Sequence, residues 1–253
     1  MVKTILVTGV SGIIGRNLIE ALERSKKYKV LLYRREMSDD ELKGLITQAD
    51  YLFHLAGVSR PTDPKDFYLG NSFFTKRVVA CIQATHKKLP IFFTSSISVE
   101  VDNDFGKSKR DAENILKQYG KDNEVEVSII RLTNTFGKWA KVGAHSVIAT
   151  FCYNVAHDLP ITVLDSSKVI TLAYVDEVTE AFVGHMEHRD VSALMKLGED
   201  GYYSMVKTYP RQLGQIADLL YLFKKENGLP SSFKDDDFAK KLYTTYVSYA
   251  SLP

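Results

Sequence analysis

A glycine-rich turn close to the N-terminus is the feature that most constrains the fold of this chain. Residues 8–15, with the sequence TGVSGIIG, follow a run rich in β-branched residues at 3–7 and precede apolar residues at helical spacing. The run predicts a strand buried on both faces, and the spacing predicts a helix. In this order the glycines let a phosphate approach the backbone, and the helix N-terminus presents unpaired N–H groups to it. The alternative is a purely structural glycine turn, which the flanking strand and helix disfavour. We expect phosphate contacts from Gly9, Ser11, Gly12, Ile13, Ile14 and Gly15.

Strand and helix patterns alternate along the first half of the chain. Further strand-like runs occur at residues 29–33, 51–55, 91–94 and 125–132, and helices are expected to begin near residues 71 and 105. This alternation predicts an α/β fold with a doubly wound parallel sheet of the Rossmann type. From about residue 138 the order loosens, and helices are expected at 146–157, 176–188, 211–227 and 235–249. We predict a dinucleotide-binding domain at 1–137 and mainly a smaller substrate lobe at 138–253, with some segments returning to the sheet.

The composition excludes several classes of partner. The net charge of the 253 residues is +2, with acidic and basic residues interspersed, which argues against nucleic acid or an anionic membrane as a partner. Cys81 and Cys152 lie outside metal-ligand spacings, so we expect both to be buried in a protein of the reducing cytoplasm. We find no signal peptide and no apolar run of membrane-spanning length. His185, Glu187 and His188 fit a cationic helix end better than a metal site, so no metal is expected.

The end of the second predicted strand indicates which dinucleotide is bound. Arg34 and Arg35 occupy the place where NAD-binding proteins usually carry an acidic residue for the ribose hydroxyls. A guanidinium group instead matches the geometry of the additional phosphate of NADP. Two alternatives remain: a shifted register that places Glu36 near the ribose, and two solvated surface arginines. We expect NADP(H), held in part by Arg34 and Arg35.

Together these motifs resemble the extended short-chain dehydrogenase/reductases. Residues 55–57, LAG, resemble the cofactor motif of that family, and residues 94–96, TSS, resemble its serine-bearing strand end. Residues 105–109, FGKSK, match its Tyr-x-x-x-Lys segment except at the first position, and residues 131–137, RLTNTFG, resemble its turn toward the sugar nucleotide. The resemblance implies cofactor contacts from Leu55, Ala56, Gly57 and Lys109, and substrate contacts from Ser96, Asn134 and Lys138.

Five strings resemble a narrower group, the capsular polysaccharide UDP-sugar reductases of the CapF/WbjC type. They are HLAGVSRP at 54–61, LGN at 69–71, FGKW at 136–139, SVIATFCY at 146–153 and LYTTYVSY at 242–249. This resemblance implies an NADPH-dependent reductase of a UDP-linked 4-keto-6-deoxy-N-acetylhexosamine in capsule or O-antigen sugar-nucleotide synthesis. Such enzymes carry a C-terminal cupin, and the sequence ends at Pro253, about where the cupin would begin. We therefore expect no cupin domain and no epimerisation step. A homodimer is considered, although the sequence does not decide the oligomeric state.

The resemblance assigns chemical roles to three residues. Ser96 would donate a hydrogen bond to the sugar carbonyl oxygen as charge develops on it. Lys109 would hold the nicotinamide ribose and lower the pKa of a neighbouring tyrosine. Phe105 stands where the family has that catalytic tyrosine, and it can neither give nor accept a proton. The alternatives are a capping role for Ser96, a solvated helix lysine at Lys109 and a structural turn at Asn134.

Phe105 leaves two functions open. Three explanations of Phe105 compete. The residue was changed to trap a complex, or the protein lost catalysis and kept binding, or Ser96 or a bound water supplies the proton in place of the tyrosine. We favour a reductase of reduced activity, because general acid catalysis contributes about 10²–10⁴-fold to a rate. The alternative is a catalytically silent protein that binds NADP and a UDP-sugar. Dehydration is disfavoured because Ile97 and Ser98 stand where sugar-nucleotide dehydratases need a carboxylate pair. A 4-epimerase is disfavoured because those enzymes usually keep NAD bound, whereas Arg34 and Arg35 favour NADP.

Overall fold

The main sheet of the computed structural model, which describes residues 2–144 and 146–252, has seven strands in the order β2-β1-β3-β4-β5-β9-β8. The first five run parallel, β9 continues the sheet parallel to β5, and β8 pairs antiparallel with β9. The predicted doubly wound Rossmann-type fold is confirmed. The strands are β1 (Lys3–Thr8), β2 (Tyr28–Leu32), β3 (Tyr51–His54), β4 (Ile91–Ser96), β5 (Val127–Leu132), β8 (Met195–Leu197) and β9 (Tyr203–Met205).

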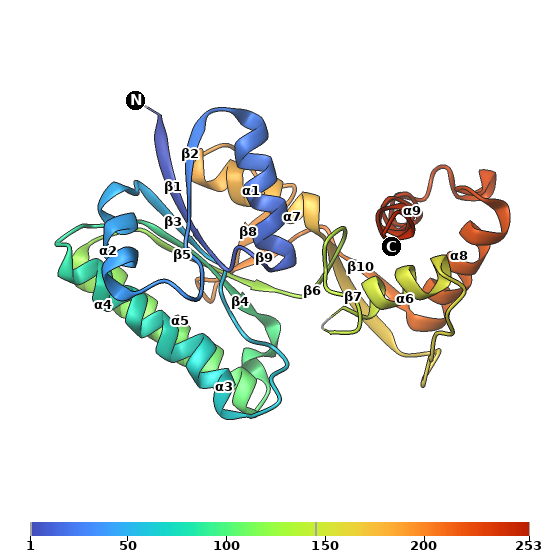
Figure 1. Ribbon diagram of the computed structural model, residues 1–253, viewed down its shortest axis with the longest axis horizontal. Coiled ribbons are helices and arrows are strands. Elements are labelled where there is room, and N and C mark those ends of the chain that lie inside the picture. The colour runs from blue at the N-terminus through green and yellow to red at the C-terminus, as the bar shows by residue number, and fades with distance from the viewer. Residues whose placement is uncertain (1, 145, 253) are drawn as a thin grey trace.

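Helices cover both faces of this sheet (Figure 1), which explains why its strands are apolar on both sides. Phe92 of β4 faces the core under one pair of helices, and Phe93 faces the core under the other three. The first pair is α1 (Ile13–Ser25) and α7 (Val175–Met186), and the other three are α2 (Asp39–Gln48), α4 (Phe74–Ala84) and α5 (Asp104–Asn123). Both cysteines are buried and free, as expected.

The helix that was expected to begin near Asn71 begins earlier. Helix α3 (Lys65–Tyr68) continues through a π-helical turn, η1 (Leu69–Phe73), into α4. Within that turn Gly70 lies so close to Val58 that an added Cβ would be 2.3 Å from the Val58 Cγ2. The expected start was wrong because the π-turn breaks the 3.6-residue period on which it was based.

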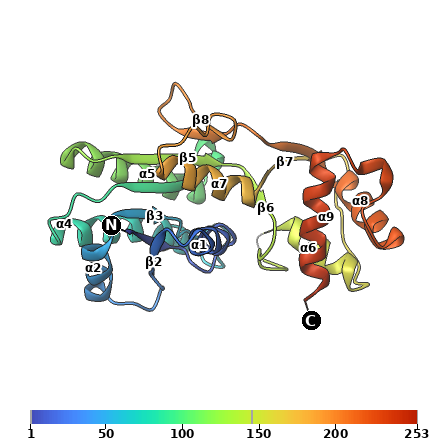
Figure 2. The same cartoon turned by 90° about the horizontal axis from the view of Figure 1, so that it is seen from above.

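The later part of the chain forms a lobe with its own core, set beside the main sheet in both views (Figures 1 and 2). A small sheet in the order β10-β7-β6 joins the two parts, while α7, β8 and β9 belong to the layers of the main sheet. The division at residue 137 stays a prediction. The lobe elements are β6 (Asn134–Phe136), α6 (Val147–Ala156), β7 (Val169–Tyr174), β10 (Tyr209–Gln212), α8 (Leu213–Glu226), η3 (Ser231–Phe233) and α9 (Asp237–Ala250). No helix in the described part of the chain is long and apolar enough to cross a membrane.

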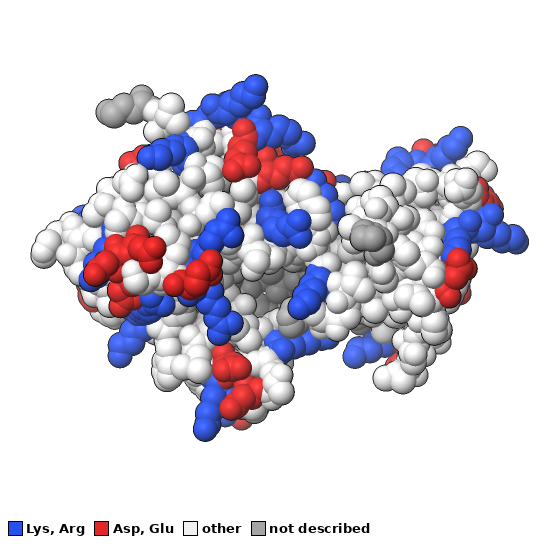
Figure 3. All heavy atoms as spheres, viewed as in Figure 1, with Lys and Arg blue, Asp and Glu red and all other residues white. Residues whose placement is uncertain are grey.

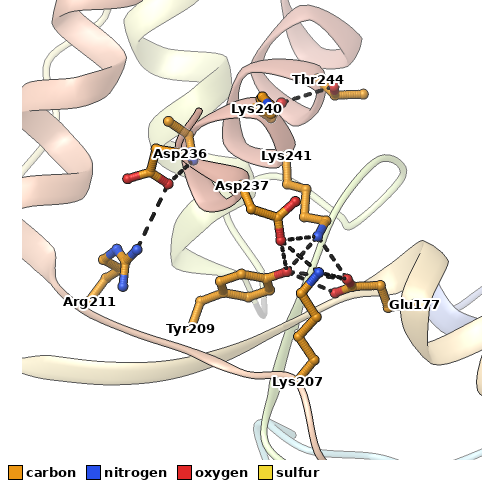
Figure 4. Close-up of polar contacts among 10 residues, drawn as sticks. Glu177, Lys207, Tyr209, Arg211, Asp236, Asp237, Lys240, Lys241 and Thr244 are labelled. Atoms are coloured by element: carbon orange, nitrogen blue, oxygen red, sulfur yellow. Dashed lines mark hydrogen bonds and ion pairs between the residues drawn. The ribbon is translucent and has the colours of Figure 1, made fainter. Parts of the chain in front are cut away.

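A polar cluster ties α7 to α9 across this junction (Figure 4). We call it the junction cluster; it consists of Glu177, Lys207, Tyr209, Asp237 and Lys241. The Lys241 ammonium lies 2.7 Å from Glu177 and 2.6 Å from Asp237, and that of Lys207 lies 2.9 Å and 2.7 Å from the same two carboxylates. The Tyr209 hydroxyl donates to Asp237 at 2.7 Å. Two carboxylates and two ammonium groups therefore balance one another between the lobe and the main sheet.

Candidate active site

The strand order of the main sheet reverses between β1 and β3, and ligands of open α/β sheets bind where such a reversal occurs. The glycine turn follows the C-terminal end of β1, and residues 55–57 follow the C-terminal end of β3. The two predicted cofactor motifs therefore lie side by side at the reversal point, although they are more than 40 residues apart in sequence. This position is where the sequence predicted the dinucleotide.

The backbone of the glycine turn leaves no room for side chains at two positions. Gly9 has a φ of +73°, and a Cβ on it would lie 2.6 Å from the carbonyl carbon of Leu55. A Cβ on Gly15 would lie 2.2 Å from the carbonyl oxygen of Gly9. Gly12 is the N-cap of α1 and brings no capping side chain. The N–H groups at the start of α1, from Ile13, Ile14 and Gly15, are therefore available to a phosphate, beside the exposed Ser11.

A buried histidine connects the glycine turn to the end of β3. His54 Nδ1 lies 2.8 Å from Thr8 Oγ1, and its Nε2 lies 3.0 Å from Thr75 Oγ1. Thr8 Oγ1 also accepts the N–H of Ala56 at 3.2 Å. Burial lowers the pKa of His54 to about 3, with a smaller contribution from the charge of Lys109, so the imidazole is neutral at pH 7. Sequence reasoning did not assign His54 this connecting role, because its partners come from β1 and α4.

The two arginines after β2 are exposed and lack partners. Arg34 and Arg35 follow β2 directly, and neither guanidinium has a hydrogen bond or an ion pair within residues 2–144 and 146–252. They are free to meet a phosphate, as the hypothesis of NADP binding requires. Glu36 is exposed beside them, so the alternative register also remains open.

Lys109 lies buried at the edge of the site. Its side chain enters from α5, and the residue is only 5% exposed. The ammonium donates to the carbonyl oxygen of Thr94 at 2.7 Å and lies 4.3 Å from the ring centre of Phe93. A Cβ placed on Gly57 would be 3.6 Å from the Lys109 Nζ, so the ammonium lies next to the motif after β3. Burial lowers the pKa of Lys109 to about 7, although Glu113 opposes the shift. The alternative of a solvated helix lysine is therefore wrong.

Ser96 and Phe105 both precede this lysine in sequence. Ser96 ends β4 and accepts the N–H of Ser98 at 3.1 Å, which is the capping role considered as an alternative. This contact uses Ser96 as an acceptor and leaves its own proton for another partner. Phe105 lies one helical turn before Lys109 and is half-buried, with its ring centre 5.6 Å from that of Phe67.

Two of the three residues expected to contact substrate, Asn134 and Lys138, differ in their surroundings. Asn134 is exposed in β6 and its side chain has no partner in the described residues. Lys138 pairs with Glu20 of α1 and lies over the ring of Trp139. The backbone carbonyl of Lys138 also accepts the side-chain amide of Asn17. Lys138 therefore anchors its loop to α1, and a role in substrate binding requires that the ion pair opens.

Figure 3 shows a hollow in the middle of the face seen in Figure 1, with Lys and Arg side chains on its rim. It lies between the main sheet and the lobe, on the side toward which β1 and β3 point. A cationic rim attracts anionic ligands such as phosphates. No group of three or more His, Cys, Asp and Glu suited to a metal occurs in the part of the chain that the structure describes.

A family model described as "NAD dependent epimerase/dehydratase family" matches residues 5–196. The chain belongs to this family. Within it, the chain is 38% identical over 246 residues to a UDP-2-acetamido-2,6-beta-L-arabino-hexul-4-ose reductase of Pseudomonas aeruginosa. The match covers 97% of this chain but 64% of the reductase, so the chain spans less than two thirds of that relative's length.

Solved structures agree with the family assignment. The capsular polysaccharide assembling protein CapF of Staphylococcus aureus superimposes with a TM-score of 0.85 at 36% identity, covering 98% of this chain and 66% of CapF. A UDP-glucuronic acid 4-epimerase of Bacillus cereus, in complex with UDP-glucuronic acid and NAD, superimposes with a TM-score of 0.77 over 97% of this chain and 98% of the epimerase. At 15% identity, this second match shows a shared fold alone.

Proposed function

We propose that this chain is an NADPH-dependent reductase of a UDP-linked 4-keto-6-deoxy-N-acetylhexosamine, in capsule or O-antigen sugar-nucleotide synthesis. The observation that carries the proposal is the position of the buried Lys109 ammonium next to Gly57, in the motif that follows β3. This position supports a role for the lysine of the FGKSK segment in holding a nicotinamide ribose. The names of the Pseudomonas reductase and of CapF support the substrate class and the capsular role.

The residues present fit a bound dinucleotide. The turn around Gly9 and Gly15 is packed so tightly that a Cβ at either position would clash with backbone atoms, and the uncapped N-terminus of α1 follows it. Arg34 and Arg35 favour NADP over NAD because their guanidinium groups are exposed, cationic and without a partner among the described residues. Since the structurally similar Bacillus epimerase holds NAD, the preference for NADP rests on these two arginines.

The bound dinucleotide would supply a hydride to the sugar carbonyl. Ser96 would donate its free proton in a hydrogen bond to the carbonyl oxygen, and the ammonium of Lys109 would hold the ribose hydroxyls. Phe105 has no proton to transfer, so the proton would come from Ser96 or from water. We expect a slow reductase for this reason.

The UDP-sugar is expected in the hollow between the main sheet and the lobe (Figure 3). Asn134 is exposed and unpaired, which suits a group that contacts the substrate. A homodimer stays a prediction that light scattering would test.

A second candidate is a silent protein that binds NADP and a UDP-sugar without turnover, and Phe105 is the observation that favours it. Purified protein should be incubated with NADPH and the 4-keto sugar nucleotide, and the product identified by mass spectrometry. Slow reduction that requires both components supports the reductase. Binding of both ligands without product supports the silent protein, and failure to bind NADPH or UDP contradicts both candidates.

A further inference from the structure

A buried ion pair lies one helical turn beyond Lys109, on the same face of α5. Glu113 is 1% exposed and accepts two hydrogen bonds from the Arg131 guanidinium of β5, at 3.1 Å from Nε and 2.9 Å from Nη2. Arg131 in turn lies 3.5 Å from the ring centre of Tyr202 and pairs with Asp200 at 3.5 Å. The two hydrogen bonds from Arg131 thus fix the Glu113 carboxylate in one orientation.

The surroundings of Lys109 contain few other charges. From β4 it meets the carbonyl of Thr94 and the ring of Phe93, both uncharged. On β3, His54 is near enough for the charge of Lys109 to affect it, and burial keeps it neutral at pH 7 by lowering its pKa to about 3. On its own helix, one turn further along, Glu113 is the carboxylate whose charge opposes the effect of burial on the pKa of Lys109.

We propose that Glu113 is a positioning residue that, held by Arg131, keeps the buried Lys109 side chain charged and aligned in the cofactor site. The i to i+4 spacing brings the two side chains together on one face of α5. A buried ammonium needs a nearby negative charge, because its transfer from water is otherwise costly. Bidentate pairing with Arg131 in turn holds the Glu113 carboxylate in place.

The charge on Lys109 determines how many hydrogen bonds it can give. An ammonium has three N–H donors, one of which goes to Thr94 and two of which remain for ribose hydroxyls. A neutral amine has one donor fewer and makes weaker hydrogen bonds. This consequence rests on the proposed function, whereas the effect of Glu113 on the charge of Lys109 does not.

The direct test is an NMR pH titration of protein labelled with ¹³C at the lysine Cε, with the Lys109 signal assigned by Lys109→Arg. We expect Lys109 to titrate near neutral pH, and Glu113→Gln to move its midpoint downward by about one pH unit or more. Asp111→Asn, which removes an exposed carboxylate from the same helix, should leave the midpoint unchanged. An unchanged midpoint in Glu113→Gln overturns the proposal.

Glu113→Gln leaves the half-buried Arg131 with Asp200 alone and can weaken the fold. The double variant Glu113→Gln, Arg131→Gln replaces the ion pair by two amides. It should lower the Lys109 midpoint by less, because a cation is lost together with the carboxylate, and a midpoint that does not fall overturns the proposal here too. Fluorescence titration near pH 6.5 should then show NADPH binding weakened about fivefold in the variant, as expected when hydrogen bonds to a charged group become neutral ones. If the midpoint moves and the parent protein does not bind NADPH, the effect of Glu113 stands and the proposed function fails.

Discussion

Phe105 and Lys109 share one face of α5, and the chemistry of the proposed site depends on this pair of side chains. We predict that Phe105→Tyr raises reductase activity by about 10²–10⁴-fold, because it restores a general acid beside a lysine that is already buried in place. Turnover of NADPH with the 4-keto sugar nucleotide measures the gain. Phe105→Leu, which brings no hydroxyl, is the control and should show none. A tyrosine variant that binds both ligands without any gain would replace the reductase by the silent protein.

The arginines after β2 carry the prediction on cofactor choice. Replacing Arg34 and Arg35 together by alanine should weaken NADPH binding by about 10–100-fold, the value of one hydrogen bond to a charged group, and leave NADH binding nearly unchanged. Arg24→Ala removes an exposed arginine at the far end of α1 and serves as the control. The affinities come from fluorescence titration of both cofactors. A preference for NADPH that survives in the double variant would assign the phosphate to other residues.

Among the elements, those with strong local signals were predicted and those held by distant contacts were not. The strand, glycine turn and helix of residues 3–25 carry their own pattern. The small sheet escaped prediction because β6 has three residues and β10 contains Pro210, too little for a period of two. Helix α2 also escaped, although Ser38 and Glu41 form a reciprocal capping box.

The same distinction holds for the residues of the site. Lys109 could be named from the FGKSK segment, because its spacing lies within one helix. Glu113 could not, since its partner Arg131 comes from a strand 18 residues further along the chain. Asn71 bridges the backbone of Val58 to Ser108, and the sequence did not predict this bridging role. Roles that depend on tertiary contacts become visible only in the fold.

Two glycine-to-alanine substitutions, one in the glycine turn and one in α2, should have opposite effects on the stability of the protein. Gly15→Ala places a Cβ 2.2 Å from the carbonyl oxygen of Gly9, so we expect destabilisation by about 1–3 kcal/mol and loss of NADPH binding. Gly44→Ala in α2 meets no atom within 4 Å and should stabilise the protein by about 0.5–1 kcal/mol. Urea unfolding and NADPH titration of both variants test this. Equal effects would show that the turn accommodates a side chain.

The whole molecule depends on how the lobe is fixed to the main sheet. Besides the small sheet, the junction cluster links α7 with α9 (Figure 4), and the ion pair of Lys138 with Glu20 joins its loop to α1. Lys207 and Lys241 hold the pKa of Asp237 below its ordinary value of 3.8, and the Asp237 and Glu177 carboxylates raise the pKa of Lys207. The cluster is thus stable at neutral pH, where both signs of charge are present.

The lowered pKa of Asp237 predicts the response of the molecule to acid. A carboxyl whose pKa is lower in the folded state stabilises the fold above its unfolded pKa, and this contribution is lost as the pH falls toward the folded value. Asp237→Asn should therefore lower the melting temperature at about pH 6, and the difference from the parent should shrink toward about pH 3. Asp235→Asn, an exposed position two residues earlier, should leave the melting curve unchanged at both pH values. Calorimetry at several pH values measures the two differences. A gap that persists unchanged in acid would mean that Asp237 stabilises the junction through packing, and that its charge contributes nothing to the attachment of the lobe.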